Sequence, residues 1–207
     1  MTGQPAPTKP SLRAAQRDVT RRRIRDSARK LFSAGRFEHV SMEDIARDAE
    51  VGRTTIYLHY PTKNALLLEL LQEDWERQAS FFDRLTATTP VNRSTLQGWV
   101  KAYALGMREA RGLFRMYMFT LSLDEEVGRL QDRHRERLIS LLGRRLPGLV
   151  TYEAARPDQR RAAAASHALI AHVEYYGGLA GSEAPREDFE AATEVLVDAL
   201  AGFMEPN

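Results

Sequence analysis

The stretch SMEDIARDAEVGRTTIYLHYPTK, residues 41–63, decides how the chain folds. Ser41 can cap a helix whose third residue is Asp44, a weaker form of the capping box, and this helix ends near Ala49. A three-residue turn follows. A second short helix then runs from Arg53 to about His59, because Pro61 cannot continue it. Two short helices joined in this way have the geometry of a helix-turn-helix, whose second helix enters the major groove of DNA.

Polar side chains on the second short helix and just after it suit contacts with DNA. The first three present a guanidinium fork that matches guanine and two hydroxyl groups whose neighbouring methyls can pack on thymine. The last three present a phenol, an imidazole and an ammonium, all of which can bind phosphate. The predicted DNA-binding residues are Arg53, Thr54, Thr55, Tyr57, His59 and Lys63. Paired short helices also occur in many all-α proteins, so the pair alone is compatible with a purely structural role.

The rest of the chain repeats the helical period and lacks strand-like alternation between turn signals. We expect an all-α protein of about nine helices, with an N-terminal three-helix domain that holds the helix-turn-helix and a C-terminal helical domain. The expected divisions are a disordered tail at 1–12, the DNA-binding domain at 13–63, a connecting helix at 64–85 and a helical body at 86–207. The other helices are expected at residues 13–34, 94–110, 113–123, 124–145, 157–179 and 186–204.

Charge is divided unevenly along the chain. Residues 1–63 hold 13 Lys and Arg against 7 Asp and Glu, a net charge of +6, whereas residues 64–207 carry a net charge of −4. A basic head on an acidic body is typical of a module that faces a polyanion, although a well-solvated end would show the same division. The chain has no cysteine, which suits a reducing cytoplasm, and no apolar run long enough for a membrane span.

The segment from Arg21 to Leu67 resembles the DNA-binding domain of the TetR/AcrR family. The resemblance rests on an ungapped series of matches: Ile24, Ala28, Leu31–Phe32, Gly35, Phe37, Val40–Met42, Ile45–Ala46, Ala49, Val51, Thr55–Tyr57, His59–Tyr60, Lys63 and Leu66–Leu67. It implies that the third helix contacts bases and that the tyrosine and lysine after it contact phosphates. Two residues depart from the family pattern. Glu50 stands where the turn usually carries glycine, which tolerates a positive φ, and Gly52 replaces a serine-like cap.

A basic run, Arg21–Arg23 with Arg25, lies in the first expected helix. One interpretation is an additional clamp on phosphates or on the minor groove of DNA. The other is an ordinary solvated helix face.

The helical body resembles the family only in its pattern, which implies a small-molecule site and a dimer interface. Two stripes of small and apolar residues on the last two helices predict the homodimer interface, with burial inside the monomer as the alternative. The stripes are Ala164, Ala168, Ala171, Tyr175 and Gly178, then Phe189, Ala192, Leu196, Leu200 and Phe203. A set rich in aromatic residues and methionine predicts contacts with an apolar or aromatic effector: Trp99, Tyr103, Met107, Phe114, Tyr117, Met118, His134, His172 and Tyr176.

Together these features predict a cytoplasmic, sequence-specific transcription regulator, a homodimer that represses from a palindromic operator until a small molecule releases it. No cofactor is expected, and no metal, since His167 and His172 are awkwardly spaced for one ion. An enzyme is the first rival, but the chain lacks phosphate-loop, nucleophile-elbow and zinc-protease motifs. A helical interaction protein without DNA binding is the second. Salt-sensitive binding to duplex DNA would separate both rivals from the regulator.

Overall fold

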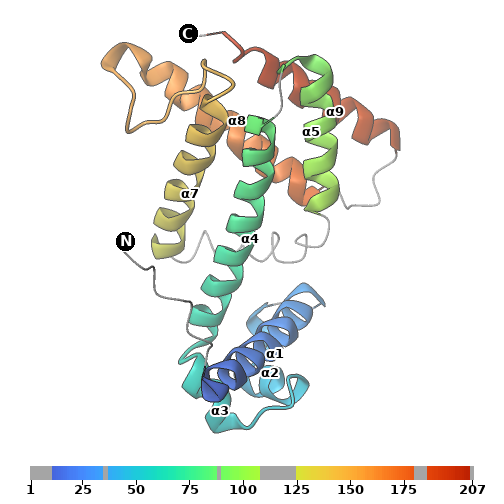
Figure 1. Ribbon diagram of the computed structural model, residues 1–207, viewed down its shortest axis with the longest axis vertical. Coiled ribbons are helices and arrows are strands. Elements are labelled where there is room, and N and C mark those ends of the chain that lie inside the picture. Colours follow the sequence, from blue (N-terminus) through green and yellow to red (C-terminus); the bar gives the residue numbers. More distant parts are fainter. Residues whose placement is uncertain (1–10, 35–36, 88–89, 108–124, 180–185, 206–207) are drawn as a thin grey trace, which may run out of the picture. The chain divides into compact units, whose positions relative to one another are not determined.

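The computed structural model describes residues 11–34, 37–87, 90–107, 125–179 and 186–205 (Figure 1). These residues form eight α-helices and two short 3₁₀-helices and contain no β-strand, so the predicted all-α class is confirmed. The chain divides into two compact units, residues 1–70 and 71–207. The long helix α4 (Lys63–Ala87) contributes residues to both.

The first unit is a small helical domain with its own core. It contains α1 (Leu12–Ala34), the 3₁₀-helix η1 (Phe37–His39), α2 (Met42–Asp48), α3 (Arg53–His59) and the first turns of α4. Helix α1 packs on α2, and α2 packs on α3. Apolar side chains fill its centre: Ile24, Ala28, Phe32, Ile45, Ile56, Tyr60, Leu66 and Leu67.

Short-range signals set the starts of two helices in this unit. The Ser41 hydroxyl accepts a hydrogen bond from the Asp44 amide at 3.1 Å, and the Asp44 carboxylate accepts one from the Ser41 amide at 3.1 Å. The predicted capping box is therefore present. Thr62 Oγ1 accepts from the Ala65 amide at 3.1 Å and caps α4. Such caps satisfy amides that the start of a helix leaves without partners.

The second unit is a bundle with a separate core. It contains the rest of α4 together with α5 (Arg93–Gly106), α7 (Glu125–Gly143), η3 (Pro157–Gln159), α8 (Arg160–Leu179) and α9 (Arg186–Ala201). Helix α5 packs on α9, and α7 packs on α8. Aromatic rings of α4 and α5 join aliphatic side chains of the other helices in the core: Phe82, Trp99, Tyr103, Leu138, Leu142, Ile170, Val173, Leu196 and Leu200.

The expected helices differ from the observed ones mainly at their ends. The last helix stops at Ala201 rather than near Met204, because the chain turns there and the Phe203 carbonyl accepts a hydrogen bond from Gly148 N at 3.0 Å. Pro157 opens a 3₁₀ turn, and α8 itself begins at Arg160. The expected helix at 113–123 and most of the expected tail lie outside the described residues.

The two stripes expected at a dimer interface differ in how far they are exposed. On α8, Ala164, Ala168 and Tyr175 are exposed, as an interface between two copies requires. On α9 the prediction is wrong, because Leu196 and Leu200 are buried in the core of their own unit. The other members of that stripe, Phe189, Ala192 and Phe203, pack against the same core. The exposed side of α9 instead carries Ala191, Val195 and Ala199, spaced four residues apart.

Candidate DNA-binding surface

Helix α3 has one buried side and one exposed side. Ile56 is fully buried, and Tyr60, which follows the helix, is 2% exposed. The opposite side presents Arg53, Thr54 and Tyr57 to solvent. This is the side that a recognition helix would turn toward DNA.

Leu58 is a fourth residue on this exposed side, and it was not among the residues predicted from the sequence. It lies four residues after Thr54, and 78% of it is exposed. Its place in the helix could have been recognised from the spacing, because residues four apart share a helix face. Thr55, in contrast, is half-buried.

The acidic side chain of Glu43 in α2 contacts both Arg53 and Tyr57 on this surface in the free protein. Its carboxylate lies 3.2 Å from Arg53 Nε and accepts a hydrogen bond from the Tyr57 hydroxyl at 3.3 Å. Arg53 nevertheless remains 76% exposed. Both side chains are thus oriented on the surface yet open to an incoming ligand.

The turn between α2 and α3 has an unusual backbone. Glu50 has a φ of 51°, the left-handed conformation that favours glycine. Its amide donates to the Arg47 carbonyl at 3.2 Å, and the Val51 amide donates to the Ala46 carbonyl at 2.9 Å. This pair of bonds defines a helix C-cap that usually has glycine in the left-handed position. The departure from the family pattern at this position therefore corresponds to a strained glutamate.

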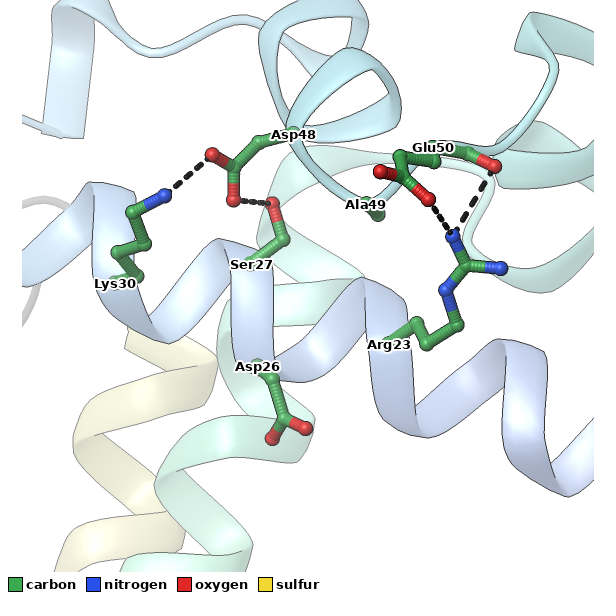
Figure 2. Close-up of a pocket in the computed structure, with 7 residues that line it drawn as sticks. All are labelled: Arg23, Asp26, Ser27, Lys30, Asp48, Ala49 and Glu50. Carbon is green, nitrogen blue, oxygen red and sulfur yellow. Dashed lines mark hydrogen bonds and ion pairs between the residues drawn. The ribbon is translucent and has the colours of Figure 1, made fainter.

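Helix α1 braces this turn, as Figure 2 shows. Arg23 Nη2 lies 2.9 Å from Glu50 Oε2 and also donates to the Glu50 carbonyl at 3.4 Å. One turn further along α1, the Ser27 hydroxyl donates to Asp48 at 2.8 Å. Lys30 Nζ lies 2.6 Å from the other oxygen of that carboxylate (Figure 2). The hydrogen bonds from Lys30 and Ser27 lower the pKa of Asp48.

These residues line a shallow surface pocket of about 350 Å³. Its charged groups are mostly paired with one another. We therefore interpret the pocket as the contact region through which α1 holds the turn between α2 and α3 in place.

A second cluster joins α1 to the beginning of α4 through the end of α3. Glu69 accepts hydrogen bonds from Arg25 Nη1 at 2.9 Å and from the Tyr60 hydroxyl at 3.0 Å, and it forms an ion pair with Arg21. Arg21 Nε also donates to Tyr60 at 3.1 Å. Burial opposes ionisation of Glu69, but the hydrogen bonds from Arg21, Arg25 and Tyr60 outweigh it and lower the pKa of this carboxyl. Arg21 and Arg25 of the predicted basic clamp thus bind Glu69 within the domain.

Two predicted phosphate contacts, His59 at the end of α3 and Lys63 at the start of α4, are both partly buried. Lys63 is half-buried, and its Nζ donates to the carbonyls of Phe37 and Val40 at 2.8 and 2.9 Å. Two of its three N–H groups therefore hold the segment before α2. His59 is half-buried. Burial, together with the charges of Arg17 and Arg21, lowers the pKa of its imidazole.

The residues predicted to contact an effector are mostly core residues in the second unit. Trp99, Tyr103, His134 and Tyr176 are buried, Met107 is half-buried, and His172 is exposed. The Trp99 indole donates to the Phe81 carbonyl at 2.7 Å, and the Tyr176 hydroxyl lies 2.5 Å from Thr193 Oγ1. The other three predicted contacts, Phe114, Tyr117 and Met118, lie outside the described residues.

Buried polar groups link three helices near these aromatic rings. Gln78 Nε2 on α4 donates to the Tyr103 hydroxyl of α5 at 2.7 Å, and Gln78 Oε1 lies 2.7 Å from His134 Nε2 of α7. Burial lowers the pKa of His134 to about 4, so this imidazole is neutral at pH 7.

A neighbouring group joins α7 to α8. Gln131 Nε2 donates to Glu174 at 2.7 Å, and Arg135 donates to the other oxygen of that carboxylate. Gln131 Oε1 is buried and has no hydrogen-bond partner among the residues that the structure describes. Such an orphaned acceptor costs free energy unless a donor reaches it.

Comparison with known proteins identifies the first unit. Residues 24–70 match the family model described as bacterial regulatory proteins, tetR family. Over this segment the chain is similar to the tetR family. Among curated relatives, the regulator EthR of Mycolicibacterium smegmatis is 32% identical over 66 residues, which is 32% of this chain and 30% of that protein. The repressor KstR of the same species is 37% identical over 81 residues, 38% of this chain and 39% of its own length. The similarity thus spans well under half the length of these curated relatives.

Solved TetR-type structures share the fold over most of the chain. A TetR-family regulator from Streptomyces coelicolor has a TM-score of 0.69 at 22% identity, and the match covers 90% of this chain and 81% of that one. Salmonella enterica GusR has a TM-score of 0.67 at 22% identity, with 89% of this chain and 95% of that chain covered. EthR and KstR are transcription regulators by name. None of this chain's described helices is long and apolar enough to cross a membrane.

Proposed function

We propose that this protein is a sequence-specific DNA-binding transcription regulator, a cytoplasmic homodimer that represses from a palindromic operator and is released by a small molecule. The exposed side of α3 carries this proposal, because it combines a guanidinium, a hydroxyl, a phenol and an apolar side chain on a helix whose entry turn is braced by α1. This mixture suits base edges in the major groove better than it suits water.

The proposed base contacts are Arg53, Thr54 and Leu58. Arg53 would exchange Glu43 for the O6 and N7 acceptors of a guanine. Leu58 has no donor or acceptor in its side chain, so it would contact a thymine methyl. Thr55 is half-buried, and its hydroxyl would reach DNA only from the edge of this surface.

The proposed phosphate contacts are Tyr57, His59 and the remaining N–H of Lys63. Because Lys63 also holds the carbonyls of Phe37 and Val40, its replacement should disturb the domain as well as the contact with DNA.

We place the homodimer contact on the exposed faces of α8 and α9. Small side chains there let two helices approach closely, and Tyr175 and Val195 leave 51% and 60% of their surfaces exposed in a single chain. A dimer would present two copies of α3, and a symmetric pair reads an inverted repeat whose half-sites lie about 34 Å apart.

The proposed effector site is the buried polar group beside the aromatic rings of the second unit. Gln131 Oε1 is an acceptor without a partner in the described part of the chain, so an apolar or aromatic molecule that carries a hydrogen-bond donor would suit it. His134 is neutral and engaged with Gln78, which makes it a hydrogen-bonding group rather than a charge for the effector.

The decisive experiment is selection of bound sequences from random genomic duplexes at two salt concentrations. Enrichment of an inverted repeat that survives the higher salt concentration would support a dimeric regulator, and binding without any enriched sequence would contradict it. On the selected operator, Arg53→Ala should lower the preference for one base pair. Leu58→Ala and replacement of thymine by uracil should cause the same loss and should not add to each other, because both remove one methyl contact.

A further inference from the structure

The first helix extends well before the region that matches the family model. Helix α1 begins at Leu12, whereas the match begins at residue 24. These twelve extra residues make about three helical turns, roughly 18 Å in length. All of their side chains are exposed or half-buried, so the extension contributes little to the core of the domain. A helix segment that buries so little within its own unit has a surface available for a partner.

The extension is strongly basic, and its arginines are not equivalent. It holds five arginines and one aspartate. Arg21 and Arg23 form ion pairs with Glu69 and Glu50, so their charges are already balanced inside the domain. Arg13 and Arg17 are exposed and have no hydrogen bond or ion pair with any residue that the structure describes. Two open positive charges therefore lie earlier in the helix than the basic run at Arg21–Arg23.

Arg13 and Arg17 lie on the side of α1 that meets the end of the recognition helix. Residues spaced four apart share a helix face, so Arg13, Arg17 and Arg21 form one row. Arg21 contacts Tyr60, which directly follows α3. The charges of both Arg17 and Arg21 act on His59 of α3. Arg22, which is also exposed, lies about half a turn away from Arg13 and Arg17.

We propose that Arg13 and Arg17 form a second DNA contact, an arm that binds the phosphate backbone next to the phosphates reached from α3. The partner is a polyanion because the row carries two open guanidinium groups and no acidic side chain. Duplex DNA is the polyanion that the neighbouring recognition helix would already hold. This inference rests on the proposed function, since it assumes that α3 docks on DNA.

The salt dependence of DNA binding tests the arm. Each phosphate contact contributes about −0.9 to the slope of the logarithm of the binding constant against the logarithm of salt concentration. Arg13→Gln/Arg17→Gln removes two contacts per subunit, so the slope should become shallower by about 1.8 per subunit. The loss should be equal on the operator and on unrelated duplexes, because phosphates carry no sequence information.

Three control variants separate the arm from other causes. Arg22→Gln changes the same helix on another face and should leave the slope unchanged. Arg129→Gln/Arg133→Gln removes two exposed arginines, also four residues apart, from α7 and tests net charge alone. Arg13→Lys/Arg17→Lys keeps both charges and should keep the slope, and circular dichroism should report unchanged helix content in all variants.

One result would be that the wild-type protein binds its operator while Arg13→Gln/Arg17→Gln shows the same salt slope. That result would overturn the proposed arm and leave the proposed function intact. An equal loss in the α7 variant would also overturn it, because net charge would then be the cause. If the wild-type protein selected no operator, the proposed function would fail. An unchanged slope on random duplexes would then overturn the arm as well, and a shallower one would support it.

Discussion

At Glu50 we predict that substitution by glycine does not destabilise the protein, which is opposite to the usual effect of glycine. A residue with a Cβ in the left-handed conformation costs about 1–2 kcal/mol, and Glu50 adopts it with a φ of 51°. Glu50→Gly removes this cost but adds about 0.4–1 kcal/mol of unfolded-chain entropy. Glu50→Ala keeps the backbone cost. The glycine variant should therefore be more stable than the alanine variant by about 0.5–1 kcal/mol.

The ion pair with Arg23 sets where the wild-type protein falls between these variants. Its side chains are 46% and 84% exposed, so the pair contributes about 0.5 kcal/mol, typical of a surface pair. Both variants lose it. Glu50→Gly should then match the wild-type protein or exceed it slightly, and Glu50→Ala should be about 0.5 kcal/mol less stable.

Urea denaturation followed by circular dichroism measures these differences, provided that the slope with urea concentration stays constant. Repeating both substitutions in an Arg23→Ala background provides the control, because the gap between glycine and alanine should persist there while wild-type Glu50 loses its advantage over alanine. An alanine variant as stable as the glycine variant would refute the reasoning, since it would show that the backbone at this position is not strained.

Four further predictions concern both units. Gly177→Ala should destabilise the protein by about 1–2 kcal/mol despite the better helix propensity of alanine, because the new Cβ would lie 2.5 Å from the Tyr103 ring. The control Gly98→Ala, which meets nothing within 4 Å, should stabilise by about 0.5–1 kcal/mol; thermal unfolding that moves both variants in the same direction would contradict the packing argument. The lowered pKa of Glu69 means that its contribution to stability is present above the unfolded-state pKa and is lost as pH falls through the folded-state value. Glu69→Gln should accordingly flatten the decline in urea midpoint below about pH 4.5, and an unchanged acid profile would argue against it. His59 is neutral at pH 7, and a nearby phosphate would raise its pKa, so operator affinity should rise as pH falls from about 7 toward 6, and His59→Asn should abolish this dependence in anisotropy titrations. Val195→Arg should yield a monomer by analytical ultracentrifugation with weak operator binding, and a stable dimer in this variant would place the interface elsewhere.

The helix-turn-helix could be predicted from the sequence because its determinants are local. The capping box at Ser41 and Asp44, the break at Pro61 and the cap at Thr62 each act within a few residues, so each has a signature in the order of the amino acids. At Glu50 the departure from the family's glycine marked the position in the sequence, and the structure showed that its backbone is strained.

The roles of individual charged and apolar side chains could not be predicted in this way. Helical spacing identifies a stripe on α9 but does not say whether it faces the core or a second subunit, and Leu196 proved to be buried. The sequence of an arginine run does not show whether its members pair with Glu69 and Glu50 or face solvent. Those partners lie 27 to 48 residues away along the chain, so only the folded structure brings them together.

The sequence by itself determined the all-α class, the helix-turn-helix and the likeness of residues 24–70 to the tetR family, since these depend on periodicity, capping and short-range spacing. Only the tertiary structure decided which arginines are open and that Lys63 binds the protein's own carbonyls. The physical reason is that burial and ion pairing depend on groups brought together by folding from distant parts of the chain.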